Sequence, residues 1–297
     1  MINKQAHLNV CAIVTTYSPD DGFPDRIAKI QSQVQCVVIV NDSASAKIKE
    51  RLARWFTGMP CIVLMHQETN RGIAAALNTG MEWAGTMGFA YAILFDDDSI
   101  ISPGMVNKMV SIFEKHPNYM SSIVAVSQNF KGKASPNEIT YQVKEVSSVI
   151  TAGSMIPLEV FQTIGLFREE LFIDYVDHEY CLRAKLKGVR ILECVGVSMV
   201  QPIGQSQKTA FGELRSIHSP LRNYYFFRNS FAVACEYFWR FPEFAIWSMW
   251  QQFKGLVKTL FFLRPKRQYL LAMILGWRDG CVCRFGRIPD DVRMRFL

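Results

Sequence analysis

The stretch that decides the fold is AYAILFDDDS, residues 90–99. Its first six residues form an apolar run that is too short for a typical helix and fits one buried strand. Three carboxylates follow directly, at Asp96, Asp97 and Asp98. Adjacent anions repel one another, so a fold keeps them together either fully solvated, as in an ordinary acidic turn, or beside a compensating cation. At the carboxyl end of a strand, a divalent metal that carries a diphosphate is a natural compensation.

The first 200 residues alternate between strand-like apolar runs and helical patterns. This alternation is typical of βαβ units and predicts an α/β fold with a mostly parallel central sheet flanked by helices. Residues 129–138 are polar and contain Gly and Pro, which indicates a surface loop. The predicted strands are 10–14, 36–40, 61–65, 90–95, 123–127, 145–151 and 189–195, and the predicted helices are 25–33, 46–56, 73–84, 103–115, 158–164 and 177–188.

Two common nucleotide-binding signatures are missing from the sequence. No Gly-x-Gly-x-x-Gly follows the first predicted strand, and no Gly-x-x-x-x-Gly-Lys-Ser/Thr occurs. The pattern therefore argues against a classical dinucleotide fold and against a P-loop NTPase.

The composition is that of a globular chain with a substantial core. Hydrophobic residues make up 49% of the 297 residues and charged residues 20%. The eight cysteines are scattered and lack the paired spacing of a zinc site, which favours reduced thiols in a cytoplasmic protein. Residues 1–9 are polar and show no apolar signal segment.

Positive charge gathers at the C-terminal end of the chain. Residues 215–297 contain 14 Lys or Arg and 5 Asp or Glu, whereas residues 1–214 contain 19 and 21. Such asymmetry points to an anionic surface as partner, and no recognised motif supports nucleic acid. We therefore predict two domains, an α/β domain with the acidic motif at 1–210 and a basic, aromatic-rich helical region at 211–297.

The helical region has the pattern of a helix that lies on a membrane. A helix predicted from Pro242 places Trp250, Phe253 and Leu260 on one face, with basic residues on its flanks. No apolar run reaches the ~18 residues that a membrane span needs. The alternative is that these helices pack on the domain at 1–210 or form an oligomer interface.

Four motifs stand in order along the chain: NDS at 41–43, NRGIA at 70–74 followed by Asn78, DDD at 96–98, and FIDYVDHEYCLR at 172–183. Together they resemble the inverting GT-A glycosyltransferases of family 2, and within it the bacterial rhamnosyltransferase-like branch. The resemblance extends over about residues 10–230 and includes RNYY at 222–225 and RN at 228–229. It implies a GT-A fold with a C-terminal helical extension.

The resemblance implies a donor site at the exits of the first strands. It places Asp42 on the pyrimidine base, where a carboxylate accepts from a ring N–H; the alternative is an Asx-turn or a helix cap. Gly72 beside Asn70 lets the backbone approach a nucleotide closely, and Asn70 also fits an ordinary N-cap. The expected donor-binding residues are Thr16, Asp42, Asn70, Gly72, Ile73, Asn78, Asp96 and Asp97.

The same resemblance implies a metal site at the acidic motif. Asp96 and Asp98 are two residues apart and can point the same way from an extended turn. They would hold Mg²⁺ or Mn²⁺ against the diphosphate, and the metal would neutralise the leaving group. Many relatives complete the site with a histidine where this chain has Gln201, which suits only a hard cation. Otherwise His218 supplies the missing ligand, or carboxylate and diphosphate hold the metal alone.

Asp177 stands where the family has its general base, and Gly153 and Ser154 stand in its acceptor-binding loop. Sugar transfer with inversion needs a carboxylate that takes the proton of the acceptor hydroxyl. A helix N-terminus keeps such a carboxylate ionised, although Asp177 is also a plausible plain N-cap. Glu179 nearby fits an ion-pair or capping residue.

The expected activity is metal-assisted transfer of a sugar, L-rhamnose from dTDP-rhamnose, to a lipid-linked polysaccharide of the O-antigen or capsule type. The enzyme would work at the periphery of the inner face of the cell membrane. The first alternative is a UDP-sugar donor carrying galactofuranose, galactose or glucose. Two other classes stay open, a nucleotidyltransferase and a non-catalytic nucleotide-binding membrane scaffold. The nucleotidyltransferase is disfavoured because residues 15–17 are not a Gly-rich basic loop.

Overall fold

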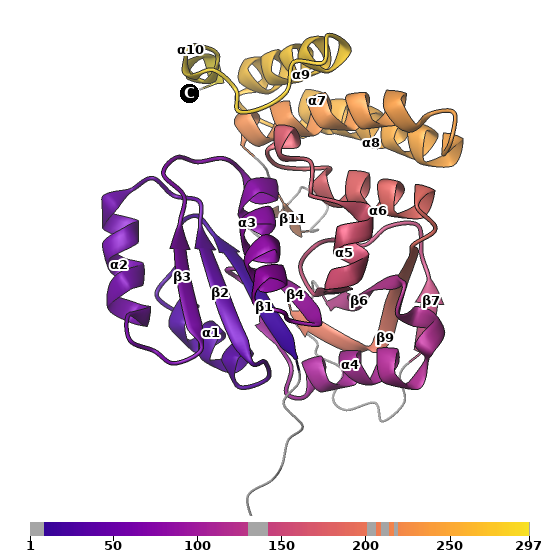
Figure 1. Ribbon diagram of the computed structural model, residues 1–297. Helices are drawn as coiled ribbons and strands as arrows, with labels where there is room; N and C mark the ends of the chain where they lie inside the picture. Colours follow the sequence, from indigo (N-terminus) through magenta and orange to yellow (C-terminus); the bar gives the residue numbers. More distant parts are fainter. Residues whose placement is uncertain (1–8, 130–141, 201–205, 209–213, 217–218, 297) are drawn as a thin grey trace, which may run out of the picture. The chain divides into compact units, whose positions relative to one another are not determined.

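The computed structural model describes residues 9–129, 142–200, 206–208, 214–216 and 219–296 (Figure 1). By its internal contacts the chain forms two compact units. The first comprises Met1–Phe167 and Arg183–Pro202, and the second comprises Arg168–Leu182 and Ile203–Leu297. The domains predicted at 1–210 and 211–297 stay a prediction. The division by contacts differs from them mainly in segment 168–182, which joins the C-terminal helices.

The first unit is built on one sheet, which has nine strands within the described residues. Their order is β3-β2-β1-β4-β8-β6-β9-β5, and β7 also pairs with β9. The pairs β1–β2, β2–β3, β1–β4 and β6–β9 are parallel, while β8 runs antiparallel to both β4 and β6. The strands are β1 (Val10–Thr16), β2 (Cys36–Asn41), β3 (Ile62–His66), β4 (Tyr91–Asp96), β5 (Ile100–Ile101), β6 (Ser122–Asn129), β7 (Gln142–Glu145), β8 (Ser154–Pro157) and β9 (Arg190–Val200).

Helices cover the two faces of this sheet because successive strand residues point to opposite sides. Val10, Ala12 and Val14 of β1 belong to a core that also includes residues of α1, α2 and α4. On the other side, Ile13 meets α3 at Gly80, where an added Cβ would lie 2.4 Å from Cγ2 of Ile13. Gly80 therefore permits the close approach of α3 to β1. The helices are α1 (Phe23–Gln31), α2 (Ala46–Phe56), α3 (Ile73–Thr86), α4 (Met105–Lys115) and α5 (Leu158–Ile164).

The predicted mixed α/β fold is confirmed, and one predicted strand, 145–151, is wrong. The chain pairs as β7 before this segment and as β8 after it. Between them a turn forms, in which the Ser154 N–H donates to the Thr151 carbonyl at 3.0 Å and Gly153 has φ +79°. A β-branched run is typical of a strand, but here the turn around Gly153 overrides it. The predicted surface loop at 129–138 lies outside the described residues from 130 onward.

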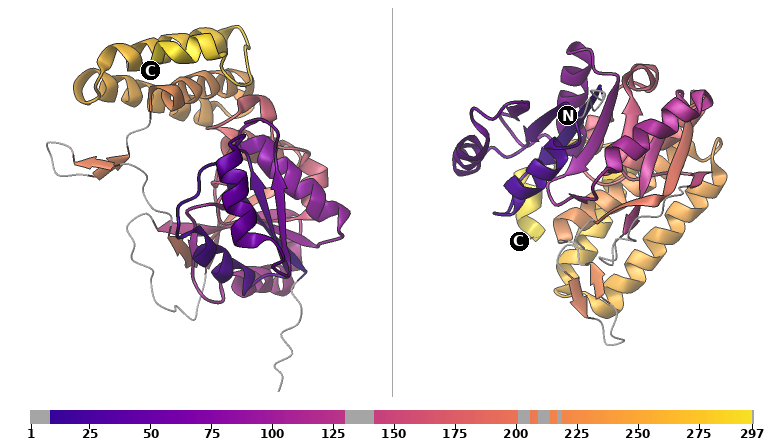
Figure 2. Two further views of the ribbon diagram at one scale, coloured as in Figure 1. Left: turned by 90° about the vertical axis from the view of Figure 1, so that its left-hand side faces the viewer. Right: turned by 90° about the horizontal axis from the view of Figure 1, so that it is seen from below.

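The second unit is helical. It contains the short helix η2 (Glu169–Leu171), the first residues of α6 (Val176–Leu186), a small antiparallel pair β10 (Ser206–Lys208) and β11 (Leu214–Ser216), and the helices that follow. Figure 2 shows the long helices lying together, and α7 packs against both α8 and α9. The helices are α7 (Pro220–Tyr237), α8 (Pro242–Phe262), α9 (Lys266–Cys281) and α10 (Asp290–Arg293), followed by η3 (Met294–Phe296).

Small residues and aromatic rings hold the second unit together. An added Cβ at Gly276 of α9 would lie 2.6 Å from the Tyr224 carbonyl oxygen of α7, so only glycine allows this helix approach. The buried cluster around it includes Tyr224, Tyr225, Ala272, Leu275, Ile288 and Phe296.

Within the described part of the chain, no helix is both long and apolar enough to cross a bilayer.

Candidate active site

A tight turn holds the three carboxylates at the carboxyl end of β4. The Ser99 N–H donates to the Asp96 carbonyl at 3.2 Å, and the Asp96 N–H donates to Ser99 Oγ at 3.1 Å. Ser99, the last residue of the turn, is buried, and its side chain therefore holds the turn against the core. The predicted placement of the acidic motif at a strand exit is therefore what the structure has.

Asp97 is held by two residues from the neighbouring β1–α1 region. Thr16 Oγ1 donates to Asp97 Oδ2 at 2.7 Å, and Arg26 Nε donates to the Asp97 carbonyl at 2.7 Å. Arg26 also pairs with Asp20, at 2.7 Å. Arg26 supplies positive charge beside the acidic turn, and the sequence analysis missed it because nothing in the motif points to a residue 71 positions earlier.

Asp98 has a buried carboxylate oxygen, Oδ1, without a hydrogen-bond partner among the described residues. Burial raises the pKa of Asp98, and the neighbouring charge of Asp97 raises it further. A buried oxygen of this kind is unfavourable unless something electropositive meets it. The acidic turn is thus suited to a cation, although in the described residues no three His, Cys, Asp or Glu side chains converge as a complete metal site. Gln201 and His218 lie outside those residues.

Asp42 braces the loop that leads into α3. Its Oδ1 accepts from the Arg71 N–H at 2.7 Å and its Oδ2 from the Gly72 N–H at 2.8 Å. Burial raises the pKa of Asp42, and these two backbone bonds work against that rise. The Asx-turn at the end of β2 belongs instead to Asn41, whose Oδ1 accepts from the Ser43 N–H at 3.1 Å.

The start of α3 is shaped by Gly72 rather than by a capping side chain. Gly72 is the residue before the helix, has φ +89°, and no side chain caps the helix start at Ile73. Asn70 Oδ1 accepts from the Gly72 N–H at 3.1 Å, so Asn70 does not cap the helix itself. Because residues with a side chain rarely adopt such a positive φ, the backbone conformation itself favours glycine at position 72.

Asn78 lies deeper than the other predicted donor residues. Its Nδ2 donates to the Phe167 carbonyl at 2.9 Å, and its Oδ1 accepts from the Phe167 N–H at 2.8 Å. Its side chain is buried. These contacts are those of a residue that fixes the chain at Phe167, and a role in donor binding stays a prediction.

The predicted acceptor residues form a turn beside β4. The Gly153 N–H donates to the Leu94 carbonyl at 2.7 Å, and the Gly153 carbonyl accepts from Val126 at 3.1 Å. Ser154 is buried, and its Oγ donates to the Ile150 carbonyl at 2.6 Å. The turn therefore sits between β4 and β6, two residues from the acidic motif along β4.

Asp177 belongs to the second unit and is the second residue of α6. Its Oδ1 accepts from the adjacent His178 N–H at 2.8 Å. The helix starts at Val176, so Asp177 lies inside the first turn and is not the residue before it. His178 packs among aromatic rings, with its ring centroid 5.1 Å from that of Trp247, in agreement with a structural histidine.

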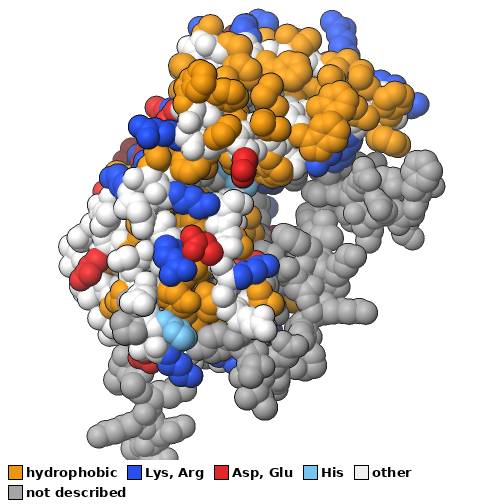
Figure 3. Space-filling view, turned by 90° about the vertical axis from the view of Figure 1, so that its right-hand side faces the viewer, with side chains coloured by type: hydrophobic (Ala, Val, Ile, Leu, Met, Phe, Trp, Pro, Cys, Tyr) orange, Lys and Arg blue, Asp and Glu red, His pale blue; other side chains and the backbone are white. Residues whose placement is uncertain are grey.

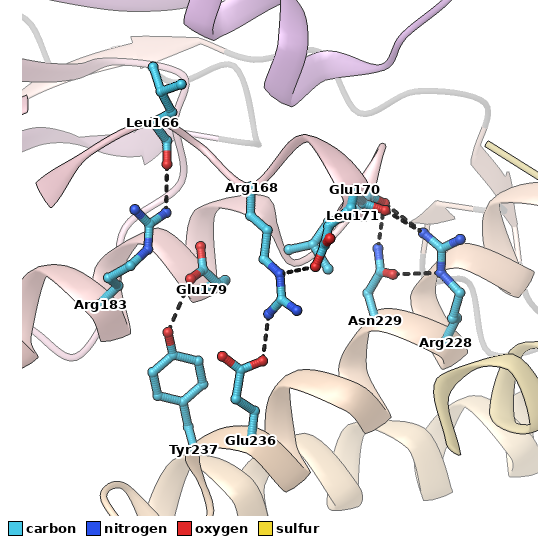
Figure 4. Close-up of polar contacts among 10 residues, drawn as sticks. All are labelled: Leu166, Arg168, Glu170, Leu171, Glu179, Arg183, Arg228, Asn229, Glu236 and Tyr237. Atoms are coloured by element: carbon cyan, nitrogen blue, oxygen red, sulfur yellow. Dashed lines mark hydrogen bonds and ion pairs between the residues drawn. The ribbon is translucent and has the colours of Figure 1, made fainter. Parts of the chain in front are cut away.

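Glu179 is held inside the second unit. Tyr237 Oη donates to Glu179 Oε1 at 3.0 Å, and Glu179 is buried (Figure 4). Nearby, Arg168 joins Glu170 and Glu236, each at 2.5 Å. In the first unit, Arg183 Nη2 donates to the Leu166 carbonyl at 2.8 Å.

Comparison with known proteins gives one consistent answer. Residues 11–174 match the family model described as Glycosyl transferase family 2. The chain is 31% identical over 239 residues to the dTDP-rhamnosyl transferase RfbF of Shigella flexneri, which covers 76% of this chain and 79% of that relative. It resembles the crystal structure of S. aureus TarS 1-349, with a TM-score of 0.61 at 12% identity over 96% of this chain and 82% of that one. It also resembles GalNAc-T7 with UDP, GalNAc and Mn²⁺, with a TM-score of 0.55 at 12% identity over 69% and 46% of the two chains.

Proposed function

Since the chain belongs to glycosyl transferase family 2 and has the GT-A fold, we propose that it transfers L-rhamnose from dTDP-L-rhamnose, with inversion, to a lipid-linked polysaccharide precursor. The choice of donor is supported by the 31% identity to a dTDP-rhamnosyl transferase over most of both chains. A UDP-sugar donor is the alternative, since structural relatives of the same fold include one described with UDP.

The proposed reaction moves one proton and one sugar. The acceptor hydroxyl oxygen attacks the anomeric carbon from the face opposite the diphosphate, and its proton passes to the Asp177 carboxylate. The bond between the anomeric carbon and the diphosphate oxygen breaks, and dTDP leaves. Support for Asp177 comes from its place in the first turn of an 11-residue helix, where the helix dipole favours the ionised carboxylate.

We further propose that Asp96 and Asp98 hold Mg²⁺ or Mn²⁺ when the donor is bound. The unpartnered Asp98 Oδ1 supports this assignment. The cation would neutralise charge on the departing diphosphate. Because the acidic turn alone offers few ligands, we expect the diphosphate oxygens to complete the coordination and the cation to bind weakly without nucleotide. Thr16 and Arg26 would keep Asp97 in place beside it.

A thermal-shift panel tests the donor and the metal together. A ligand that binds only the native state stabilises the protein and raises its melting temperature. At a ligand concentration of 100 times the Kd, the stabilisation is about 2.7 kcal/mol. We expect dTDP to raise Tm more than UDP or GDP, and Mn²⁺ to enlarge that shift. A larger shift with UDP selects the alternative donor, and no shift with any nucleotide contradicts nucleotide-sugar transfer.

Because the proposed acceptor is linked to a lipid, we also propose that α8 lies on an anionic membrane surface. The side that α8 buries is small or polar, at Ala245, Ser248, Gln252 and Thr259. Its exposed side is apolar and repeats with helical spacing. Exposed apolar residues on it are Ile246, Trp247, Met249, Trp250, Phe253, Leu260, Phe261 and Phe262.

This arrangement is the reverse of an ordinary surface helix, which buries its apolar side. Figure 3 shows hydrophobic side chains gathered over the helices of the second unit, with Lys and Arg at their edges. Trp239, just before α8, is 88% exposed. Exposed Arg240 precedes the helix, and exposed Arg264, Lys266 and Arg267 follow it. An apolar face flanked by cations fits the interfacial region of a bilayer with anionic lipids.

Vesicle sedimentation tests the membrane proposal. We expect the protein to bind vesicles that contain phosphatidylglycerol and to bind phosphatidylcholine vesicles less. The double substitution Trp250→Ser with Phe253→Ser should reduce binding, whereas Met87→Ser, an exposed methionine of the first unit, should not. No binding to either vesicle, together with a dimer in solution that these substitutions dissociate, would assign the same face to an oligomer interface.

A further inference from the structure

The backbone just before α6 is strained. Phe172, Asp174 and Tyr175 have φ of +67°, +62° and +64°, a region that non-glycine residues rarely adopt. Phe172 is the centre of a classic γ-turn, with ψ −63° and a 2.8 Å bond from the Ile173 N–H to the Leu171 carbonyl. Such conformations are unfavourable and persist only where the surrounding contacts impose them.

One side chain of α7 lies under this strained segment. Asn229 Nδ2 is 2.8 Å from the Leu171 carbonyl oxygen, 2.8 Å from that of Ile173 and 2.9 Å from that of Asp174. Asn229 is fully buried. Its amide group thus contacts three of the four backbone carbonyl groups in residues 171–174.

Arg228 fixes the orientation of that amide group (Figure 4). Its Nε donates to Asn229 Oδ1 at 2.8 Å, which directs Nδ2 toward the carbonyls. Its Nη2 donates to the Leu171 carbonyl at 2.9 Å and its Nη1 to the Gly286 carbonyl at 2.7 Å. The guanidinium also lies 4.9 Å from the ring centroid of Tyr225, and each of its three nitrogens has a hydrogen-bond acceptor.

We propose that Asn229, oriented by Arg228, is a positioning residue for the general base. This proposal rests on the proposed function, in which Asp177 takes the acceptor proton. Asp177 follows the last of the three bonded carbonyls by three residues, and the strained segment leads straight into its helix. The direction in which α6 starts, and therefore the place of the Asp177 carboxylate, follows from the backbone that Asn229 holds.

Other contacts in the same unit support the segment from its flanks. Arg222 Nη2 pairs with Asp174 Oδ1 at 3.0 Å, and Tyr175 Oη lies 2.9 Å from Ser248 Oγ of α8. These contacts hold side chains, whereas Asn229 contacts the backbone carbonyls of Leu171, Ile173 and Asp174 and shares the first of them with Arg228. A general base must lie within hydrogen-bond reach of the proton that it takes, and a misplacement of about 1 Å can lower turnover about 100-fold.

The test measures turnover of dTDP-L-rhamnose as release of dTDP with water as acceptor, because a base that activates an alcohol also activates water. If the thermal panel favours a UDP-sugar, that donor replaces it. Asn229→Leu removes the donor groups at nearly constant size. Arg228→Lys keeps the charge but loses the bond to Asn229 Oδ1. Trp277→Phe is the matched control. It removes a partly buried hydrogen bond to Gln252 in the same unit and leaves the contacts of residues 171–175 unchanged.

We expect kcat to fall about 10- to 100-fold in Asn229→Leu and Arg228→Lys, with KM for the donor within about twofold. The control should lose stability but keep kcat. In an Asp177→Asn background, Asn229→Leu should lower kcat by less than about twofold more, because residues that act through one group are not additive.

Either of two results overturns the proposal: both variants keep the control's kcat, or the loss multiplies in the Asp177→Asn background. If Asn229→Leu does not fold, Arg228→Lys decides by the same criteria, and failure of both to fold assigns the pair to folding alone. A separate outcome, Asp177→Asn with wild-type turnover, refutes the proposed role of Asp177 and not the contacts of Asn229.

Discussion

Asp42 offers a substitution whose effect follows from two hydrogen bonds. Its carboxylate accepts from the Arg71 and Gly72 amides at 2.7 and 2.8 Å, one bond to each oxygen. In Asp42→Asn, one acceptor oxygen remains, and the new NH₂ group faces the second amide. The change therefore weakens one charge-assisted bond and replaces the other by two opposed donors.

The expected loss of stability is about 2 kcal/mol. A hydrogen bond to a charged group contributes about 1.5–3 kcal/mol, and a buried donor left unpaired costs about 1–3 kcal/mol. Two effects offset part of this loss. Asn70 Oδ1 still accepts from the Gly72 N–H at 3.1 Å, and the burial that raises the pKa of Asp42 no longer acts on a charge. For a unit of this size, 2 kcal/mol lowers Tm by about 4–8 °C.

Thermal unfolding at pH 7, with and without dTDP, measures the effect. Asp21→Asn is the matched control, because the Asp21 side chain is 97% exposed. We expect Asp42→Asn to unfold about 4–8 °C below the control and to need more dTDP for the same upward shift. A Tm within 1 °C of the control would refute the bracing role of Asp42, and an unchanged dTDP response would separate Asp42 from the donor site.

Three further predictions follow from contacts described above. Asp98→Asn should abolish the part of the dTDP thermal shift that depends on Mn²⁺ and leave the shift by dTDP alone; an unchanged Mn²⁺ response contradicts the assignment of Asp98. Tyr175, whose pKa burial raises from 10.0 to about 12, keeps its proton in the folded state after the unfolded state has lost it. Its contribution to stability is therefore complete below pH 10 and lost between pH 10 and 12. The difference in unfolding free energy between wild type and Tyr175→Phe, measured by urea unfolding, should narrow between pH 10 and 12. A difference that stays constant would contradict the raised pKa of Tyr175. The triple change Arg264→Gln, Lys266→Gln and Arg267→Gln should weaken binding to phosphatidylglycerol vesicles about 100-fold, at about 1 kcal/mol per charge, and equal binding excludes these residues from the membrane surface.

Most of the fold could be predicted because buried strands and amphipathic helices leave a periodic pattern in the sequence. The run before the acidic motif is one example, since β4 covers Tyr91–Asp96. The prediction failed at 145–151, where Gly153 and the hydroxyl of Ser154 close a turn that periodicity does not reveal.

The candidate site was predictable only as a set of motifs. Asp96, Asp97 and Asp98 stand together in the sequence, but their partner Arg26 becomes visible only in three dimensions. Asn229 contacts a segment 55 to 58 residues earlier, and no local pattern carries that information.

The orientation of α8 was also beyond the sequence. The spacing of Trp250 and Phe253 shows that they share a face, but two faces of a helix are equally available to a neighbour. In the structure α7 takes the face with Ser248, whose Oγ donates to the Ser230 carbonyl at 3.1 Å. Trp250 and Phe253 are consequently exposed, and this arrangement underlies the membrane proposal.

The most direct test of sugar transfer is the rate of dTDP release from dTDP-L-rhamnose, compared between the wild-type protein and Asp177→Asn in the presence of Mn²⁺. Loss of a general base lowers turnover about 10²- to 10⁴-fold, and the substitution should leave the dTDP thermal shift intact. Equal rates in the two proteins, with the same nucleotide bound, would contradict the account.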